Sequence, residues 1–426
     1  MTEPVTTVDA GPAPAARSVH RFRLRFLTLL AVLGPGLIAG LSDDDPAGIT
    51  TYSVQGTDYG YQLLWVLLVS TIALVLFQSL SARIGVVTGQ GLAGLIRQKY
   101  GARAATVGML ALLVANVGTT AAEFAGIAAG FELFGVSRYL SVPATAVLVS
   151  ALVLRGGFRG VERILLALSA VFVCYIAAGF LAHPDWLAAG KGLVVPTMPA
   201  TKNAMVIAAA TLGTTLAPWG LSFIQSYVVD KRLTTKDLHY LRIDVVTGAL
   251  LTGVIGFFVV IACAATLHVR GVNINDAADA AAALQPLAGR LAKELFAVGL
   301  IGAALLAASI LPLSTAYAIS DLTGRPAALD DKIADAPLFY GTYAFVTLIG
   351  MGLVLIPSAP LVPILVLTQV VNAVLLLPLL AFMYGISRDH DLMSEYAATR
   401  LTASAYLVAI VLITACILAL GYFSLF

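Results

Sequence analysis

One segment near the N-terminus reads Gly34-Pro35-Gly36-Leu37-Ile38-Ala39-Gly40-Leu41-Ser42-Asp43-Asp44-Asp45-Pro46-Ala47-Gly48-Ile49. It places three consecutive aspartates midway through an apolar run long enough to cross a membrane. Each carboxylate costs about 2.5–3.5 kcal/mol at the centre of a spanning helix. Pro46 removes a backbone donor and clashes with the preceding turn, and Gly48 loosens the chain further. We therefore expect an unwound segment at residues 42–47, which is tolerated at that depth only against protein or a water-filled cavity.

The composition of the whole chain indicates a membrane protein. Hydrophobic residues make up 59% of the 426 residues and charged residues 11%, against about 25% charged in a soluble domain. The mean hydropathy of +0.93 has the same meaning. The net charge of +2 gives no indication of a nucleic-acid partner. The sequence contains no nucleotide-binding loop, GxSxG elbow or HExxH helix, so we expect no enzyme activity and no resident cofactor.

The apolar runs predict an all-α polytopic fold with eleven membrane-spanning helices, each needing about 20 residues. A short basic arm at residues 1–25 precedes them and does not resemble a cleavable signal peptide. The spans are expected at residues 26–56, 61–86, 104–134, 139–155, 160–182, 203–229, 239–268, 290–321, 338–357, 361–386 and 401–424.

The distribution of basic residues predicts the orientation of these spans. With the N-terminus in the cytoplasm, the arm and the loops on the same side contain 19 of the 25 Lys and Arg residues. Short cytoplasmic loops carry such an excess. We therefore expect a cytoplasmic N-terminus, an external C-terminus and a location in the inner (plasma) membrane of the cell.

The sixth span contains a second interruption. Gly213, Pro218 and Gly220 break the apolar run from Thr211 to Gly220, five spans after the first break. On its own this pattern is as consistent with a simple kink as with a functional break. The pair of breaks predicts two inverted halves, at residues 26–182 and 203–386, followed by an eleventh helix at 401–424. Paired interrupted helices indicate a transporter substrate site.

A carboxylate beside exposed backbone carbonyls suits a cation, because hard cations take oxygen ligands. Asp45 adjoins the proline and is the best candidate ligand. Asp43 and Asp44 have three alternative roles: they line the pathway, cap a half-helix, or line the outer vestibule. Ser42 and Thr214 are candidates for backbone carbonyl ligands beside the two breaks.

The chain resembles the Nramp family of divalent metal transporters from about residue 30 to 424. The resemblance implies a LeuT-type five-plus-five inverted repeat with discontinuous helices 1 and 6. The matching stretches begin with Gly34–Gly36 and Asp45-Pro46, and continue with Gly60–Val66, Gln78–Gly89, Ala122–Gly126, Lys293–Leu300, Gln369–Asn372 and Arg388–Met393.

The departures from the family pattern concern the metal ligands. The family's Asp-Pro-Gly-Asn motif is here Asp45-Pro46-Ala47-Gly48, so Gly48 replaces the liganding Asn. The family's Met-Pro-His motif is here Ala217-Pro218-Trp219, so a thioether and an imidazole are both replaced. In the third helix, Thr120 occupies the position where the family often has an Asp, one turn before Glu123.

These replacements favour a hard metal ion. A thioether favours softer transition metals, and Ala217 cannot supply one. Mg²⁺ usually keeps several waters and is bound by one or two carboxylates. The pattern resembles the divergent, Nramp-related magnesium transporters, which implies uptake of partly hydrated Mg²⁺, and of Mn²⁺, as transported substrate. Trp219 and Thr120 cannot titrate, so we expect transport without proton coupling, by alternating access around Asp45, Gly48, Thr214 and Ala217.

The remaining polar residues of the spans have competing roles. Glu123 either belongs to the pathway or holds helix three to its neighbours by hydrogen bonds. Gln369 either ligates the ion in an occluded state or makes an interhelical hydrogen bond worth about 0.6 kcal/mol. Asn372 is assigned to the surroundings of the site by resemblance alone. Trp219 is expected to form a packing or gating wall.

Two rival functions stay open. One keeps the fold and carries Mn²⁺ or Fe²⁺ together with protons. The other is a sodium-coupled symporter of small organic solutes, in which the carboxylate ligates Na⁺. The expected partners are the metal ion and the lipid bilayer, and the expected oligomeric state is a monomer or a weak oligomer.

Overall fold

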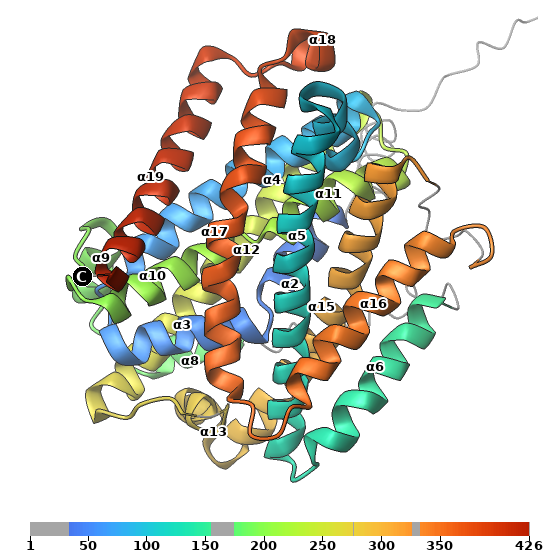
Figure 1. Cartoon of the computed structure of the whole chain (residues 1–426). Coiled ribbons are helices and arrows are strands. Elements are labelled where there is room, and N and C mark those ends of the chain that lie inside the picture. The colour runs from blue at the N-terminus through green and yellow to red at the C-terminus, as the bar shows by residue number, and fades with distance from the viewer. Residues whose placement is uncertain (1–33, 155–173, 276, 326–332, 426) are drawn as a thin grey trace, which may run out of the picture.

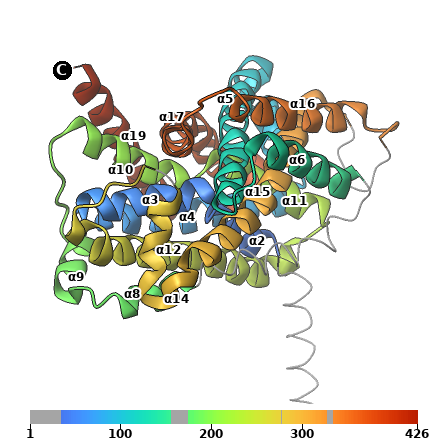
Figure 2. The ribbon, with the colours of Figure 1, turned by 90° about the horizontal axis from the view of Figure 1, so that it is seen from below.

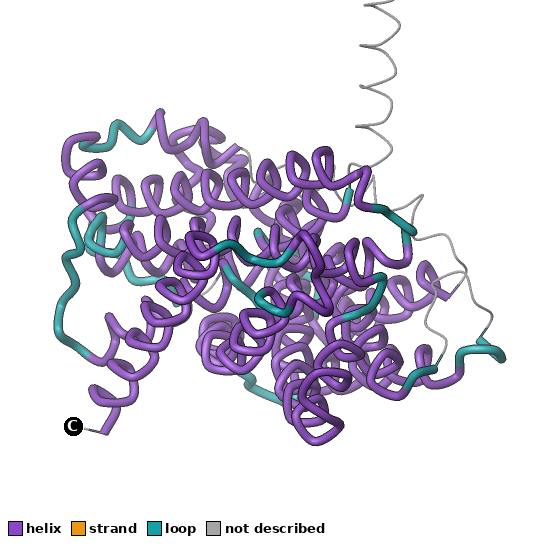
Figure 3. The backbone as a smooth tube through the Cα atoms, turned by 90° about the horizontal axis from the view of Figure 1, so that it is seen from above, coloured by secondary structure: helices purple, strands orange, loops and turns teal. Residues whose placement is uncertain are grey.

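The computed structural model describes residues 34–154, 174–275, 277–325 and 333–425, and within these ranges the regular structure is entirely helical (Figure 3). The predicted basic arm at residues 1–25 lies outside the described residues, as does most of the predicted span at 160–182. Of that span, the structure describes α8, Cys174–Leu181.

The first span is broken, as the sequence predicts. Helix α2 covers Pro35–Asp43 and α3 covers Pro46–Tyr59, so only Asp44 and Asp45 lie between them. The unwound segment is therefore shorter than the predicted 42–47. Pro46 begins α3, where a proline is tolerated because the first backbone amides of a helix have no intrahelical acceptor.

The sixth span is broken in the same way. Helix α10 covers Lys202–Thr215 and α11 covers Pro218–Asp230, and Leu216 and Ala217 separate them. Pro218 again occupies the first position of the second half. At each break one helix ends, two residues follow, and the next helix begins at a proline.

The other helices agree with the predicted spans to within a few residues at most ends. Eight elements of the described chain are long and apolar enough to cross a membrane, and Arg138–Leu154 is a shorter apolar helix. Seven of these eight elements contain α4 (Leu64–Thr88), α5 (Leu92–Leu133), α12 (Leu238–Thr266), α15 (Ala292–Thr323), α16 (Pro337–Val354), α17 (Leu361–Ser387) and α19 (Arg400–Leu425), and the eighth consists of α10 and α11. The shorter apolar helix is α6 (Arg138–Leu154). The short ones are α9 (Trp186–Val194), α13 (Ala277–Ala281), α14 (Gln285–Ala288) and α18 (His390–Met393).

Helix α5 begins earlier than the predicted span at 104–134. Its backbone is non-helical at Gly101, where φ is 88°, so Leu92–Leu133 consists of two helices joined at a kink. The residues before Gly101 form a short helix that the apolar pattern does not reveal, because Arg97 and Lys99 interrupt it.

The two broken helices lie side by side and run in opposite directions (Figure 1). Helix α10 packs against α3, and α11 packs against α2. The first half of each helix therefore meets the second half of the other, which brings the two breaks together in the interior.

Helix α12 runs unbroken along both halves of the first broken helix, and Figure 2 shows it beside α3 and α4. Three glycines allow this close approach. A Cβ on Gly36 would lie 2.4 Å from Val245 Cα, one on Gly40 2.6 Å from Gly248 O, and one on Gly56 2.4 Å from Val260 O. Small residues at such contacts let helix backbones approach closely in membranes.

Candidate functional site

The three aspartates at the first break are buried but have different hydrogen-bond partners. Asp43 Oδ2 accepts a hydrogen bond of 3.1 Å from Gln78 Nε2 of α4. Neither oxygen of the Asp44 carboxyl has a partner among the described residues. Asp45 Oδ1 accepts a hydrogen bond of 2.6 Å from the amide of Gly48. The capping role considered for Asp43 and Asp44 thus belongs to Asp45, which caps α3.

Gly48 brings the two breaks into contact. A Cβ at this position would lie 2.8 Å from the carbonyl oxygen of Asp43 and 3.1 Å from Thr214 Oγ1. It would also lie 3.3 Å from Asp45 Oδ1. Because glycine leaves this space open, a carbonyl, a hydroxyl and a carboxylate converge on it from both broken helices. Ser42 precedes them in the last turn of α2, and its buried hydroxyl has no partner among the described residues.

Two residues beside the aspartates were not identified from the sequence as site residues. Gln78 holds Asp43 from α4. Tyr52 of α3 lies near Asp44, and its hydroxyl is 2.8 Å from Thr215 Oγ1 at the end of α10. Both are polar side chains within spanning helices, and Gln78 also begins the Gln78–Gly89 stretch of the family resemblance. Neither signal places the side chain beside the aspartates.

Glu123 of α5 faces Asp45. Helix α5 approaches the break so closely that a Cβ on Gly126 would lie 2.3 Å from Pro46 Cβ. Both carboxyl oxygens of Glu123 are buried without a partner of standard hydrogen-bond geometry among the described residues. Thr120, one turn earlier, contacts α16 instead, where a Cβ on Gly350 would lie 2.7 Å from its methyl group.

Gln369 and Asn372 lie on α17, against the end of α10. A Cβ on Gly213 would lie 1.8 Å from the backbone oxygen of Gln369. Asn372 Nδ2 donates hydrogen bonds of 2.9 Å to Gln369 Oε1 and to Thr119 Oγ1. In this conformation the side-chain oxygen of Gln369 therefore belongs to an interhelical network.

Trp219 and Ala217 are buried in an apolar cluster that includes Phe223 and Tyr343. The ring centroids of Trp219 and Phe223 are 6.3 Å apart. The backbone oxygen of Trp219 accepts a hydrogen bond of 3.1 Å from Ser314 Oγ of α15. The side chain of Trp219 therefore packs against apolar and aromatic side chains beside the second break.

The buried ionisable side chains described above at the site are acidic. Asp43, Asp44, Asp45 and Glu123 are at most 3% exposed, and no Lys, Arg or His side chain is buried in the part of the chain that the structure describes. Isolated charges in a low-dielectric interior are costly unless they are paired or bind a cation. Among the described residues, no three His, Cys, Asp or Glu side chains form a closed metal-binding group. Any bound cation would therefore rely on carbonyl, hydroxyl or water oxygens as well.

Two antiparallel interrupted helices, with buried carboxylates at the first break, are typical of membrane transporters built on broken helices. The family model described as natural resistance-associated macrophage protein-like, Nramp, matches residues 36–422. The chain belongs to the Nramp family.

Three relatives illustrate the relationship. A protein of Burkholderia ambifaria named divalent metal cation transporter MntH is 32% identical over 66% of this chain and 65% of its own length, slightly less than two thirds. A protein of the same name from Granulibacter bethesdensis is 27% identical over 94% of this chain and 92% of its own length. The crystal structure of a manganese transporter from Eremococcus coleocola superposes with a TM-score of 0.74 at 19% identity, covering 97% of this chain and 88% of that one.

The structural likeness confirms the all-α, LeuT-type fold expected from the sequence. The number of spans, eleven, stays a prediction.

Proposed function

We propose that this protein carries divalent metal ions across a membrane by alternating access, with Mg²⁺ as the main substrate and Mn²⁺ as a second one. The ion remains partly hydrated and binds between the two breaks. Its proposed surroundings are Asp45, Gly48, Thr214, Ala217, Ser42 and Gln369, with the carboxylates of Asp43, Asp44 and Glu123 nearby.

One observation carries this proposal: buried oxygen atoms without partners gather at the two breaks, and no buried basic residue accompanies them in the described chain. They include Asp43 Oδ1, both oxygens of Asp44, and the hydroxyls of Ser42 and Thr214, and the carboxyl of Glu123 faces Asp45 beside them. A dication supplies the missing charge, and its waters supply the missing hydrogen bonds. Oxygen ligands of this kind suit Mg²⁺ and Mn²⁺.

The proposed preference for Mg²⁺ rests on the residue at the second break, Ala217, which cannot supply a thioether ligand. Ala217 ends the break with a methyl group, and its neighbours in the same cluster are apolar and aromatic. Among the described residues, this cluster contains no Met or Cys that could favour softer ions. The relatives named above are a divalent metal cation transporter and a manganese transporter, which supports the wider class of substrate.

We further propose that transport is not coupled to protons. Thr120 and Trp219 cannot titrate, and a membrane potential alone provides a driving force. With the cytoplasm 100 mV negative, entry of a dication is favoured by about 4.6 kcal/mol, at about 2.3 kcal/mol per charge. The orientation needed, with a cytoplasmic N-terminus in the inner membrane, is the one that the basic loops predict.

The test uses proteoliposomes that contain the full chain, a Mg²⁺-sensitive dye and a pH-sensitive dye. We expect Mg²⁺ influx driven by a potassium diffusion potential, without acidification of the lumen. Acidification that depends on Mg²⁺ would contradict uncoupled transport, and absence of influx would contradict Mg²⁺ as a substrate. Liposomes without protein, and liposomes with the Asp45→Asn variant, provide the controls.

A second candidate function is proton-coupled transport of Mn²⁺ or Fe²⁺, which the names of the relatives favour. Competition distinguishes the two, because Cd²⁺ inhibits strongly only if a soft ligand reaches the ion. A sodium-coupled symporter of small solutes is a third, weaker candidate, and uptake of a radiolabelled amino acid would support it. We propose a monomer or a weak oligomer as the working unit.

A further inference from the structure

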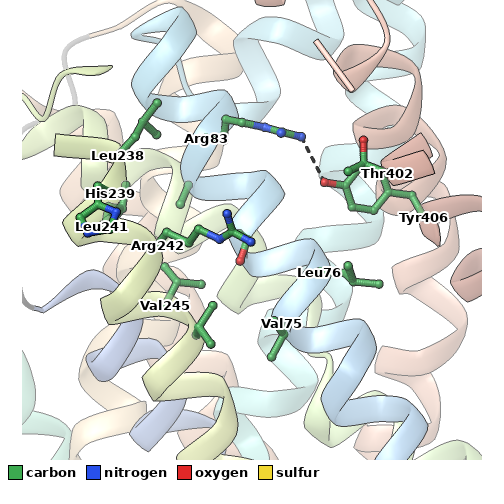
Figure 4. A pocket seen from close by; sticks show the side chains of 13 residues that line it. Val75, Leu76, Arg83, Leu238, His239, Leu241, Arg242, Val245, Thr402 and Tyr406 are labelled. Carbon is green, nitrogen blue, oxygen red and sulfur yellow. Dashed lines mark hydrogen bonds between the residues drawn. The ribbon is translucent and has the colours of Figure 1, made fainter. Parts of the chain in front are cut away.

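A groove of about 420 Å³ lies between α4, α12 and α19, and its lining includes none of the residues at the two breaks (Figure 4). Its lining is polar and basic at one end and aliphatic at the other. Arg83 and Arg242 form the basic end, and Val75, Leu76 and Val245 form the aliphatic end. The volume falls within the range of about 300–1,000 Å³ that is usual for small-ligand sites.

The basic end carries positive charge without a counter-ion. Arg83 Nη2 donates a hydrogen bond of 3.1 Å to the hydroxyl of Tyr406, while its Nε is buried without a partner. Arg242 and His239 line the same end. The lining contains no Asp or Glu, and within the described ranges none of these three basic side chains belongs to an ion pair. Such a cluster fits an anion.

The rest of the groove fits a hydrocarbon chain. On α4, Arg83 follows Val75 by eight residues, which places the two about 12 Å apart along the helix axis. Two of the helices that line the groove also carry exposed aliphatic side chains: Ile72 of α4 is 53% exposed and Ile243 of α12 is 42% exposed. In a chain that spans a membrane, exposed aliphatic side chains of this kind face lipid rather than water.

We propose that this groove binds an anionic phospholipid, with its phosphate between Arg83 and Arg242 and an acyl chain along Val75, Leu76 and Val245. Basic pockets between membrane helices on the cytoplasmic side are suited to acidic headgroups. Arg83, near the end of α4, and Arg242, near the start of α12, lie on the side that the basic loops assign to the cytoplasm. A free phosphate would occupy the basic end alone and would leave the aliphatic half without a role.

The test measures lipid binding to the purified full chain by native mass spectrometry, with phosphatidylglycerol, phosphatidylcholine and inorganic phosphate as probes. We expect tighter binding of phosphatidylglycerol than of phosphatidylcholine. The Arg83→Gln/Arg242→Gln variant should bind phosphatidylglycerol about thirtyfold more weakly, since each arginine near an acidic lipid contributes about a factor of five. Arg103→Gln is the matched control, because Arg103 is exposed near the same end and lies outside the groove; its affinity should not change.

Three results would overturn the proposal. They are equal affinity of the double variant and the unmodified chain, equal binding of the two phospholipids, and displacement of phosphatidylglycerol by inorganic phosphate at comparable concentration. If the double variant does not fold, the single variant Arg242→Gln tests the lipid site instead. Arg242 is exposed, so its replacement is expected to leave the fold intact. That single variant should lose about fivefold in affinity, and an unchanged affinity counts against the lipid site.

Discussion

Asp45 Oδ1 accepts a hydrogen bond of 2.6 Å from the backbone amide of Gly48, three residues further along the chain. The same carboxylate thus caps the second half of the first broken helix and carries charge at the proposed ion site. Asparagine caps helices about as well as aspartate. The two roles of Asp45 can therefore be separated by one substitution.

We predict that Asp45→Asn keeps the fold and reduces Mg²⁺ flux at least about tenfold, which corresponds to 1.4 kcal/mol of lost interaction. The neutral amide still caps α3 but no longer offers a full negative charge to a dication. Flux in proteoliposomes and the thermal unfolding midpoint are measured together. Normal flux in this variant, at an unchanged midpoint, would remove Asp45 from the ion site.

We predict that Gly48→Ala lowers both stability and flux. The added methyl group would lie 2.8 Å from Asp43 O and 3.1 Å from Thr214 Oγ1, inside normal contact distance. Overpacking of this kind costs about 1–3 kcal/mol. The matched control is Gly341→Ala on α16, where no atom lies within 4 Å of the added Cβ. A control as damaging as Gly48→Ala would show that the effect is not specific to the break.

We predict that Ala217→Met strengthens inhibition of Mg²⁺ uptake by Cd²⁺ about tenfold, because the thioether supplies a soft ligand at the second break. Ala217→Leu adds a side chain of similar volume without sulfur and serves as the control. Inhibition curves for Cd²⁺ are compared in the two variants. Equal inhibition would mean that residue 217 does not reach the ion.

We predict a pH-dependent contribution to stability from an ion pair outside the spanning segments. Lys99 lies against Asp389 and lowers the pKa of that carboxyl below its ordinary value. The stabilisation is therefore present above the ordinary pKa of about 3.9 and is lost as the pH falls through the lowered value in the folded protein.

Asp389→Asn tests this contribution while keeping the cap of α18, which the Asp389 side chain forms with the amides of Asp391 and Leu392. We expect a small decrease of the unfolding midpoint at neutral pH that shrinks as the pH falls below the ordinary pKa of an aspartate, about 3.9. The shift is small because exposed ion pairs contribute little. A decrease that persists in acid would point to the cap instead of the charge.

The first break was predictable from the sequence because three aspartates adjoin Pro46, whereas the pattern around Pro218 was as consistent with a simple kink. Pro46 and Pro218 each begin a new helix. Pro143, Pro312 and Pro378 lie inside continuous helices, so a proline alone does not predict a break. The predicted unwound segment at 42–47 was too long, because Ser42 and Asp43 complete the last turn of α2. The family resemblance was likewise predictable, and the match over residues 36–422 confirms it.

The contacts between helices were not predictable in the same way. Gln78 reaches Asp43 because α4 folds beside the first break. Tyr52 follows Asp45 by seven residues on α3 itself, but its contact with Thr215 depends on the packing of α3 against α10. The kink at Gly101 was missed because a short polar helix has no apolar run to reveal it. The network that joins Gln369 to Asn372 and Thr119 depends on the packing of α17 against α5.

The glycine contacts along α12 have a mechanical consequence for the gap between α2 and α3. Gly36 and Gly40 hold the first half, and Gly56 holds the second half, against one continuous helix. The side chain of Asp244 also accepts hydrogen bonds from the amides of Gly34 and Gly36 at the start of α2. Because α12 is continuous and contacts both α2 and α3, the angle between α2 and α3 cannot change while α12 stays in place. Under the proposed transport function, we therefore expect α2, α3 and α12 to move together when access to the ion changes.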